Sequence, residues 1–330
     1  MRNFFANSLH LARWASRSPC FECDCSSSPD NPSKWVKNID VETQDFCVLT
    51  NQEAQENPSS NHLLFHSIPG LTTKFVRGDA LHILWVHGVV SHLMGSILFH
   101  LCWYDYPAKQ KKPPSERLAL VWGHIQEAYT AAKSSTRLSN LRLSMFTDPK
   151  KPHVSCPSLA IKGAEAKHLL PCLLHVGKKL LQPHVFHESC MLDAMQTMVD
   201  LVDLYDKSDV FLTVHEWQKA YTLGKEFLVA YHACYQWAQE EGRQLFNIVF
   251  KHHSFCHLVD NSRYINPRCH WCWSNEDFVG KISLLTFSVS PGVGASRLSL
   301  KVAPKYRVLL HLLLQREGFL DSTKAFSDLP

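Results

Sequence analysis

Asp79 and His82 form the first set of residues whose types and spacing could do chemistry. Asp79 follows a strand-like run over 62–76 and precedes a long apolar helix, so its carboxylate is placed to hold a divalent cation through oxygen. His82 lies three residues later, on the same face of a helix as Asp79. A purely structural interpretation is also open, because Asp is a favoured helix N-cap.

Closely spaced cysteines near the N-terminus form the second set, which is Cys20, Cys23 and Cys25. Thiolates at this spacing are typical of half a zinc knuckle, and Cys47 or His62 would complete it. With only half of the motif visible, unpaired surface or buried thiols are the alternative.

A third set lies between residues 252 and 272 and mixes cysteine with histidine. It predicts a mixed-ligand zinc site built from Cys256, Cys269 and Cys272 with His252, His253, His257 or His270. Because a single CxxC is present without a second one, buried thiols beside core aromatics are the competing interpretation. Glu276 follows in the first turn of a predicted helix, where the helix dipole favours a carboxylate.

Composition places the chain among globular proteins. It has 330 residues, 45% hydrophobic and 19% charged, which fits one large domain or two modest ones. Its 12 cysteines are irregularly spread, unlike the framework of a small secreted domain, so we expect a reducing compartment. There is no G-x-S-x-G, Walker-type or G-x-G-x-x-G motif, and no small-molecule cofactor is evident.

The net charge of +4 hides an uneven distribution. Acidic residues dominate 188–241, which predicts either a solvated face or a surface for a protein partner. Basic residues dominate 107–151 and predict either a solvated face or a phosphate-contacting DNA surface. The candidate DNA-binding residues are Lys109, Lys111, Lys112, Arg117, Arg137, Arg142, Lys150 and Lys151.

The elements that must position these residues are mostly helices. Apolar spacing predicts helices over 80–103, 117–133, 160–181, 187–205 and 252–261. Capping signals at Thr213 and Ser274 open two more, and Pro304 is the expected first residue of the last helix. Short strands are expected over 62–76, 137–146 and 245–250.

Two segments bear on location in the cell. Residues 80–103 contain no charged side chain, but four histidines fall on several sides of the helix, which favours a buried helix in a soluble protein over a membrane span. Residues 1–20 are basic and lack acids, in the style of a mitochondrial transit peptide. We therefore expect a nuclear or cytoplasmic protein, or a mitochondrial one if Met1 is the true start.

Taken in order, these segments resemble CACTA-like and KDZ-like DDE transposases. Asp79-Ala-Leu-His82 with Gly88 is similar to their D-x-x-H segment, and 161–171 is similar to their K-A-x-E-x-R-x-L-L-x-P helix. Lys251-His252-His253 with His257, Pro267, Trp271 and Glu276 resembles their K-H-H…H…G-P…W…E segment. The cysteines near Cys20 resemble a Cys-rich insertion of that family.

The resemblance implies a ribonuclease-H-like core interrupted by a large helical insertion. It makes Asp79 and Glu276 the second and third acids of a site for two Mg²⁺ or Mn²⁺ ions, with His82 beside Asp79. The family's first aspartate has no counterpart, since Asp40 and Asp45 follow no convincing strand, and Asn266 replaces the glycine of G-P. We therefore expect a truncated or degenerate transposase-derived protein, not catalytically competent alone.

The expected fold class is thus α+β, predominantly α-helical, with an incomplete ribonuclease-H-like core. Its expected parts are a Cys-containing, loop-rich segment (1–60), a core strand and apolar helix (61–106), a helical insertion (107–243), and a core strand with C-terminal helices (244–330). DNA binding is the first expected function. The alternatives are a helical protein-interaction protein and a zinc-stabilised structural protein.

Overall fold

The computed structural model describes residues 19–20, 22–45, 47, 77–104, 112–292, 294–316 and 318, without the side chains of 274–279, 295 and 296. The chain forms two compact units, Met1–Trp271 and Cys272–Pro330. Each unit is described by itself below. The first unit carries the candidate metal ligands of the N-terminal segment and Asp79.

The described residues are predominantly helical and contain no strand, only an isolated bridge between Ser26 and Trp35. The helical prediction is confirmed, but the strands predicted over 137–146 and 245–250 are wrong. Residues 245–249 form a loop, and Phe250 already begins α10 (Phe250–Asn261).

The segment 137–146 shows why the alternation misled. That segment buries Leu138, Leu141 and Phe146 from an irregular loop that ends in the 3₁₀ helix η3 (Leu143–Met145). The alternating apolar residues of this segment are therefore buried side chains of a loop and do not belong to a paired strand. The strand expected over 62–76 lies outside the described residues.

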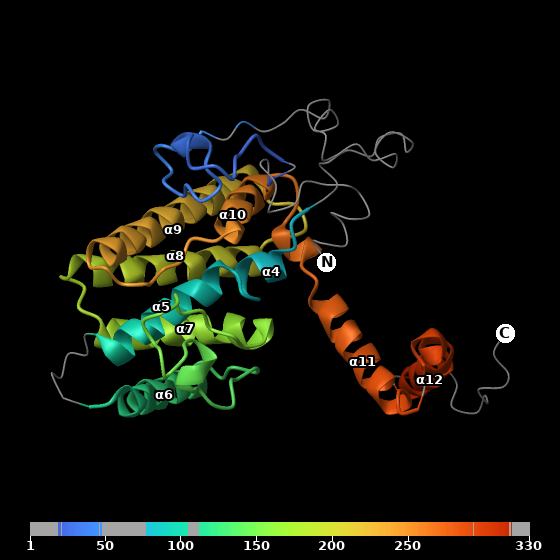
Figure 1. The fold of residues 1–330 in the computed structure, drawn as a ribbon. Helices are drawn as coiled ribbons and strands as arrows, with labels where there is room; N and C mark the ends of the chain where they lie inside the picture. Colours follow the sequence, from blue (N-terminus) through green and yellow to red (C-terminus); the bar gives the residue numbers. More distant parts are fainter. Residues whose placement is uncertain are drawn as a thin grey trace. The chain divides into compact units, whose positions relative to one another are not determined.

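Helix α5 (Val89–Trp103) is the centre of the first unit (Figure 1). It contacts α6 (Pro114–Ala131), α7 (Gly163–Leu180), α8 (Phe186–Lys207) and α10 (Phe250–Asn261). The segment Ala80–Trp103 is long and apolar enough to cross a membrane, but 83% of its most apolar window is buried inside the protein. Its apolar side chains therefore already have protein neighbours, as a core helix requires.

The predicted single helix over 80–103 is two helices. The short helix α4 (Ala80–Leu84) ends before Gly88, where α5 begins. A Cβ at Gly88 would lie 2.4 Å from the backbone of Ile83 and Leu84, so only glycine fits this corner. The preceding residue His87 has a φ of 49°, which also breaks the helix.

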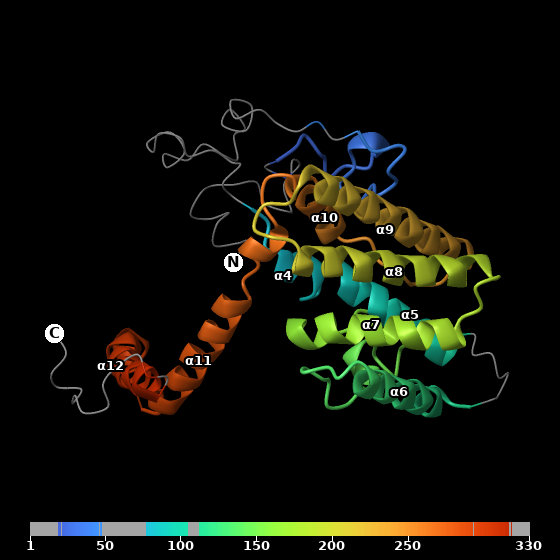
Figure 2. The same cartoon turned by 180° about the vertical axis from the view of Figure 1, so that it is seen from behind.

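Helices α8 and α9 (Val214–Glu240) share the most extensive contact among the described helices and run side by side (Figures 1 and 2). The predicted capping box is present, since Thr213 Oγ1 accepts from the Glu216 N–H and Glu216 Oε2 accepts from the Thr213 N–H. Gly242 ends the helix with a φ of 63°. Of the two helices, α9 lies beside the N-terminal segment, since its His232 and Tyr235 line a pocket with residues 32–43.

Residues 19–20 and 22–45, the N-terminal segment, form irregular structure whose one described helix is the 3₁₀ turn η1 (Pro32–Lys34). Its small apolar core consists of Cys20, Cys23, Cys25 and Val36, against which Phe250 of α10 packs. Figure 1 shows this segment, in blue, beside α9 and α10.

The second unit consists, within its described part, of α11 (Trp273–Val289) and α12 (Ala295–Arg316), which pack on each other. The start predicted for the last helix is wrong, because Pro304 lies inside α12. Several large apolar side chains are exposed on the two helices, among them Leu284, Phe287 and Leu300.

Candidate metal centre

Three cysteines of the N-terminal segment meet a histidine of α10. One ligand atom from each of Cys20, Cys23, Cys25 and His253 lies within 4.8 Å of the other three. Cys23 Sγ is 3.3 Å from His253 Nε2, and all four residues are buried. The cysteines are free thiols.

Helix α10 presents a second histidine one turn after the first. His257 Nε2 lies 3.1 Å from His253 Nε2 and 3.5 Å from Cys20 Sγ. Because residues at i and i+4 share a helix face, both imidazoles point at the cysteines. His257 is therefore an alternative nitrogen donor for the same centre.

Glu22 supports this arrangement from behind. One of its carboxylate oxygens accepts from Asn261 Nδ2 at 2.7 Å and lies 4.0 Å from His257 Nδ1. A carboxylate behind the outer nitrogen of a histidine orients the ring and increases its basicity as a ligand. The N-terminal segment thus supplies thiols and a second-layer carboxylate, while α10 supplies the nitrogens.

The electrostatics of the cluster favour one thiolate. Burial raises the pKa of Cys20, but hydrogen bonds from Cys23 and Cys25 and the positive charge of His257 outweigh it and hold the pKa well below its ordinary value. The hydrogen bonds with Cys20 and Cys25 raise the pKa of Cys23. Burial lowers the pKa of His257, yet the charge of Cys20 raises it to about 9. Both shifts favour a thiolate at Cys20 beside a protonated His257.

Three thiols and one imidazole are the ligand set of a structural zinc site. Tetrahedral zinc with Zn–S of about 2.3 Å and Zn–N of about 2.0 Å separates sulfur from nitrogen by about 3.5 Å. The 3.3 Å between Cys23 Sγ and His253 Nε2 is close to that edge. A bound divalent cation would also deprotonate the remaining thiols, as metal binding requires. The cluster is therefore compatible with zinc.

The centre combines ligands from two sets that the sequence keeps apart. Cys47, a predicted fourth ligand, is exposed and accepts from Lys34 Nζ, and His62 lies outside the described residues. Cys256 lies near the His252 carbonyl and Cys269 is exposed, so the structure does not bring them into the cluster. Cys272 belongs to the second unit.

The histidines of the third set also divide. His252 is buried with Nδ1 near the Val249 backbone, and His270 Nδ1 donates to the Gly78 carbonyl. Only His253 and His257 face the thiols. A histidine pair at i and i+4 on a predicted helix was the signal in the sequence that could have singled them out.

Asp79 is the N-cap of α4. Its Oδ1 accepts from the Leu81 N–H at 3.1 Å, and its Oδ2 pairs with His82 Nδ1. The capping interpretation is thereby confirmed. Glu276 lies in α11, where its side chain is outside the described part of the chain, so its pairing with Asp79 stays a prediction.

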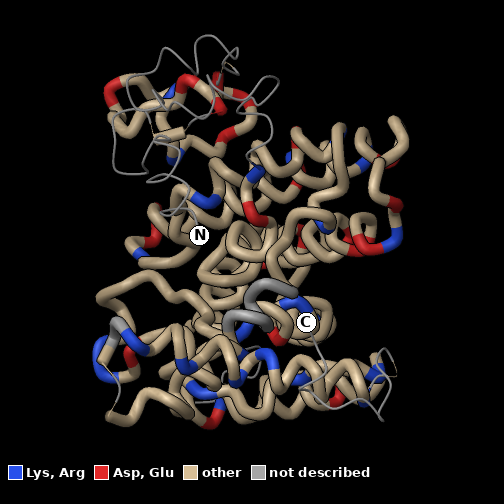
Figure 3. Tube along the Cα trace, turned by 90° about the vertical axis from the view of Figure 1, so that its right-hand side faces the viewer, with Lys and Arg blue, Asp and Glu red and all other residues tan. Residues whose placement is uncertain are grey.

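The predicted DNA-binding residues fall into two groups. The guanidinium of Arg117 donates to three backbone carbonyls, those of Lys112, Cys102 and Tyr104, and so closes the α5–α6 connection. The exposed members, which are Arg137, Arg142, Lys150 and Lys151, lie in the loop between α6 and α7. Figure 3 marks the Lys and Arg positions along the chain in blue and the Asp and Glu positions in red. Lys109 and Lys111 lie outside the described residues.

Comparisons of the chain with protein-family models, with curated proteins and with solved structures give no match, so what the chain does is argued from its own residues.

Proposed function

We propose that the chain is a zinc-stabilised protein in which one metal ion holds the N-terminal segment on α10. The observation that carries this is the convergence of Cys20, Cys23 and Cys25 with His253, across 230 residues of sequence between Cys23 and His253. Four buried ligand atoms of the types that zinc prefers form a closed site, the kind that stabilises a fold rather than catalyses a reaction.

The N-terminal segment needs such a link. Its own core is four side chains, and it has a short 3₁₀ turn and an isolated bridge as regular structure. Apolar burial on this scale does not offset the entropy of ordering about 25 residues. Structural zinc contributes roughly 10–16 kcal/mol in zinc-finger peptides, which is enough to order the segment.

The test is metal content with matched cysteine variants. Purified chain reconstituted with zinc should hold one ion by native mass spectrometry, and Cys23→Ser should hold none. Cys47→Ser, which removes an exposed thiol two residues after that segment, should keep the ion. Chelation should make residues 22–45 sensitive to protease while α8 and α9 stay protected. A wild-type chain that binds no zinc under these conditions overturns the proposal.

DNA binding by a transposase-derived protein is the second candidate. Residues 112–162 carry eight basic residues (Lys112, Arg117, Lys133, Arg137, Arg142, Lys150, Lys151, Lys162) against three acids (Glu116, Glu127, Asp148), a net charge of +5. The motif order supports the origin, and with it a degenerate ribonuclease-H-like core in the nucleus. A Mg²⁺- or Mn²⁺-dependent activity would need Asp79, which already caps α4.

Salt dependence tests this second candidate. Binding to duplex DNA should weaken steeply as salt rises, and reversing Arg142, Lys150 and Lys151 to Glu should reduce the slope of log K against log salt by about three. The control reverses Lys207 and Lys225 on the acidic helices. If instead the chain ignores DNA and captures a basic protein, the acidic residues of α8 and α9 are the interaction surface.

A further inference from the structure

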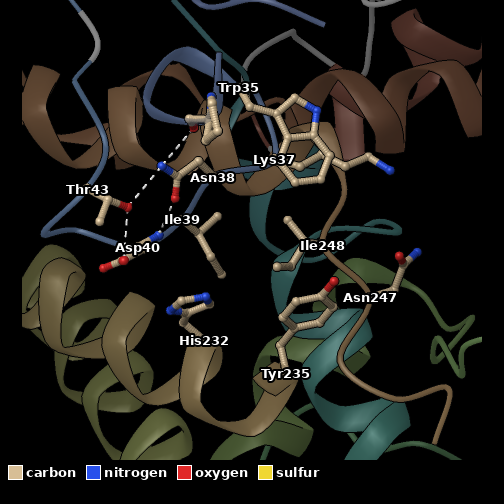
Figure 4. Close-up of a pocket in the computed structure, with 11 residues that line it drawn as sticks. Trp35, Lys37, Asn38, Ile39, Asp40, Thr43, His232, Tyr235, Asn247 and Ile248 are labelled. Carbon is tan, nitrogen blue, oxygen red and sulfur yellow. Dashed lines mark hydrogen bonds between the residues drawn. The ribbon is translucent and has the colours of Figure 1, made fainter. Parts of the chain in front are cut away.

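A pocket lies between the N-terminal segment and α9 (Figure 4). Its volume is about 310 Å³. One wall is formed by residues 32–43, and the other by His232, Tyr235, Asn247 and Ile248. This volume is at the lower end of the range for small-molecule sites, so it suits one planar ring system and not a large cofactor.

Some polar groups in the pocket wall are already engaged. The Asp40 carboxylate accepts from the Glu42 N–H and the Thr43 hydroxyl, and these hydrogen bonds lower its pKa. The Asn38 amide donates to the Pro32 carbonyl and Thr43 and accepts from the Asp40 N–H. These residues build the wall and are not free to recognise a ligand.

Three other polar groups of the pocket wall make no hydrogen bond to the residues that the structure describes. They are the Tyr235 hydroxyl, the Asn247 side-chain amide and the Lys37 ammonium. Trp35 and Tyr235 add aromatic faces, and His232 lies nearly parallel to Tyr235, with ring planes 15° apart. Burial lowers the pKa of His232 although Asp40 opposes it, so this ring is neutral near pH 7.

We propose that this pocket binds a planar nucleobase that carries a phosphate. The aromatic rings offer stacking, the Asn247 amide offers a donor and an acceptor to a base edge, and Lys37 offers a charge to phosphate. Figure 4 shows Trp35 and Lys37 on one side of the pocket and Asp40 and His232 on the other, which places the phosphate away from the carboxylate. A cationic ligand is disfavoured, because the Lys37 ammonium would repel it.

A nucleobase with phosphate could come from a free nucleotide or from an unpaired base in single-stranded DNA. The pocket proposal stands without the proposed zinc site, except in one respect. Because residues 32–43 follow the three cysteines directly, the zinc proposal adds that metal removal opens this wall. A chain that binds nucleotide equally well with and without zinc would contradict that link and leave the pocket itself intact.

The experiment titrates the full zinc-loaded chain with adenosine monophosphate by calorimetry and with a labelled 12-nucleotide single strand by anisotropy. Binding of either probe should weaken between about fivefold and 100-fold in Trp35→Ala and Tyr235→Ala. The control is Tyr221→Ala. Tyr221 also lies on α9, but its ring faces the Lys225 ammonium and does not line the pocket. Melting curves confirm that each variant is folded.

The variant Lys37→Gln distinguishes recognition of the phosphate from recognition of the base. It should weaken the monophosphate and leave adenosine unchanged, because the ammonium contacts only phosphate. Preference for the monophosphate identifies a free nucleotide as the ligand, and preference for the strand identifies an unpaired base. If neither probe binds the wild-type chain, or if Trp35→Ala and Tyr235→Ala bind as tightly as Tyr221→Ala, the proposal is overturned.

Discussion

Cys23 Sγ lies 3.3 Å from His253 Nε2, although 230 residues separate the two in the sequence. This contact joins a segment with almost no regular structure to a helix that packs on α4, α5 and α9. A second histidine on the same helix, His257, contacts Cys20. The pair of histidines makes the choice of nitrogen ligand a measurable property of the chain.

We predict that His253 is the zinc ligand and that His257 supports the centre from beside it. His253→Gln should lower zinc affinity by at least 100-fold, because the fourth ligand is lost. His257→Gln should lower it about 10-fold, the lower end of the range for outer-shell residues. Competition with a chromogenic chelator measures both affinities. Equal losses in the two variants would show that the histidines exchange as ligands.

Asp79 gives a prediction that separates capping from metal binding. Asp79→Ala should lower the free energy of unfolding by about 1 kcal/mol, because the Leu81 N–H loses its acceptor. Asp79→Asn should retain most of that stability, since Asn is an equally good cap. Urea unfolding with and without Mg²⁺ is the measurement. A Mg²⁺-dependent stabilisation that disappears in Asp79→Asn would instead assign the carboxylate to a metal.

The sequence was informative where local rules decide. The Thr213 capping box, the cap at Asp79 and most helices follow from spacing and residue type alone. Prediction from the sequence failed where tertiary contacts decide the structure. Leu138 and Leu141, for example, are spaced as in a strand but are buried side chains of a loop. The metal centre lies between these cases. Each half is visible in the sequence, but no local pattern shows that Cys23 meets His253 rather than Cys47 or His62.

Two glycines in helices should respond oppositely to alanine. A Cβ at Gly95 of α5 would lie 2.8 Å from Ser158 Cα and 2.9 Å from the Leu159 backbone nitrogen, so Gly95→Ala should destabilise by about 1–3 kcal/mol. A Cβ at Gly123 of α6 would meet no atom within 4 Å, so Gly123→Ala should stabilise by about 0.5–1 kcal/mol. Denaturant unfolding of both variants checks the signs. A neutral Gly95→Ala would mean that the 158–159 backbone does not pack against α5.

Acid stability should depend on His92, which is buried in α5. Burial, followed by the positive charge of Lys251, lowers the pKa of His92 to about 4. The unfolded chain binds this proton near pH 6.5, so between pH 6.5 and 4 the unfolded state holds more protons and stability falls as pH falls. The free energy of unfolding falls by about 3 kcal/mol in all, and about 2 kcal/mol of this loss occurs by pH 5.

His92→Gln isolates this contribution from the other groups that titrate in the same range, the metal ligands included. Urea unfolding of wild type and variant at pH 7.5 and 5 gives two pH-dependent losses of stability, and the wild-type loss should be larger by about 2 kcal/mol. Histidines other than His252, whose pKa is lowered by burial and then by the charge of His92, contribute equally to both proteins and cancel. Equal losses in the two proteins would mean that His92 takes up its proton in the folded state at an ordinary pH, and that α5 is open to water at this position.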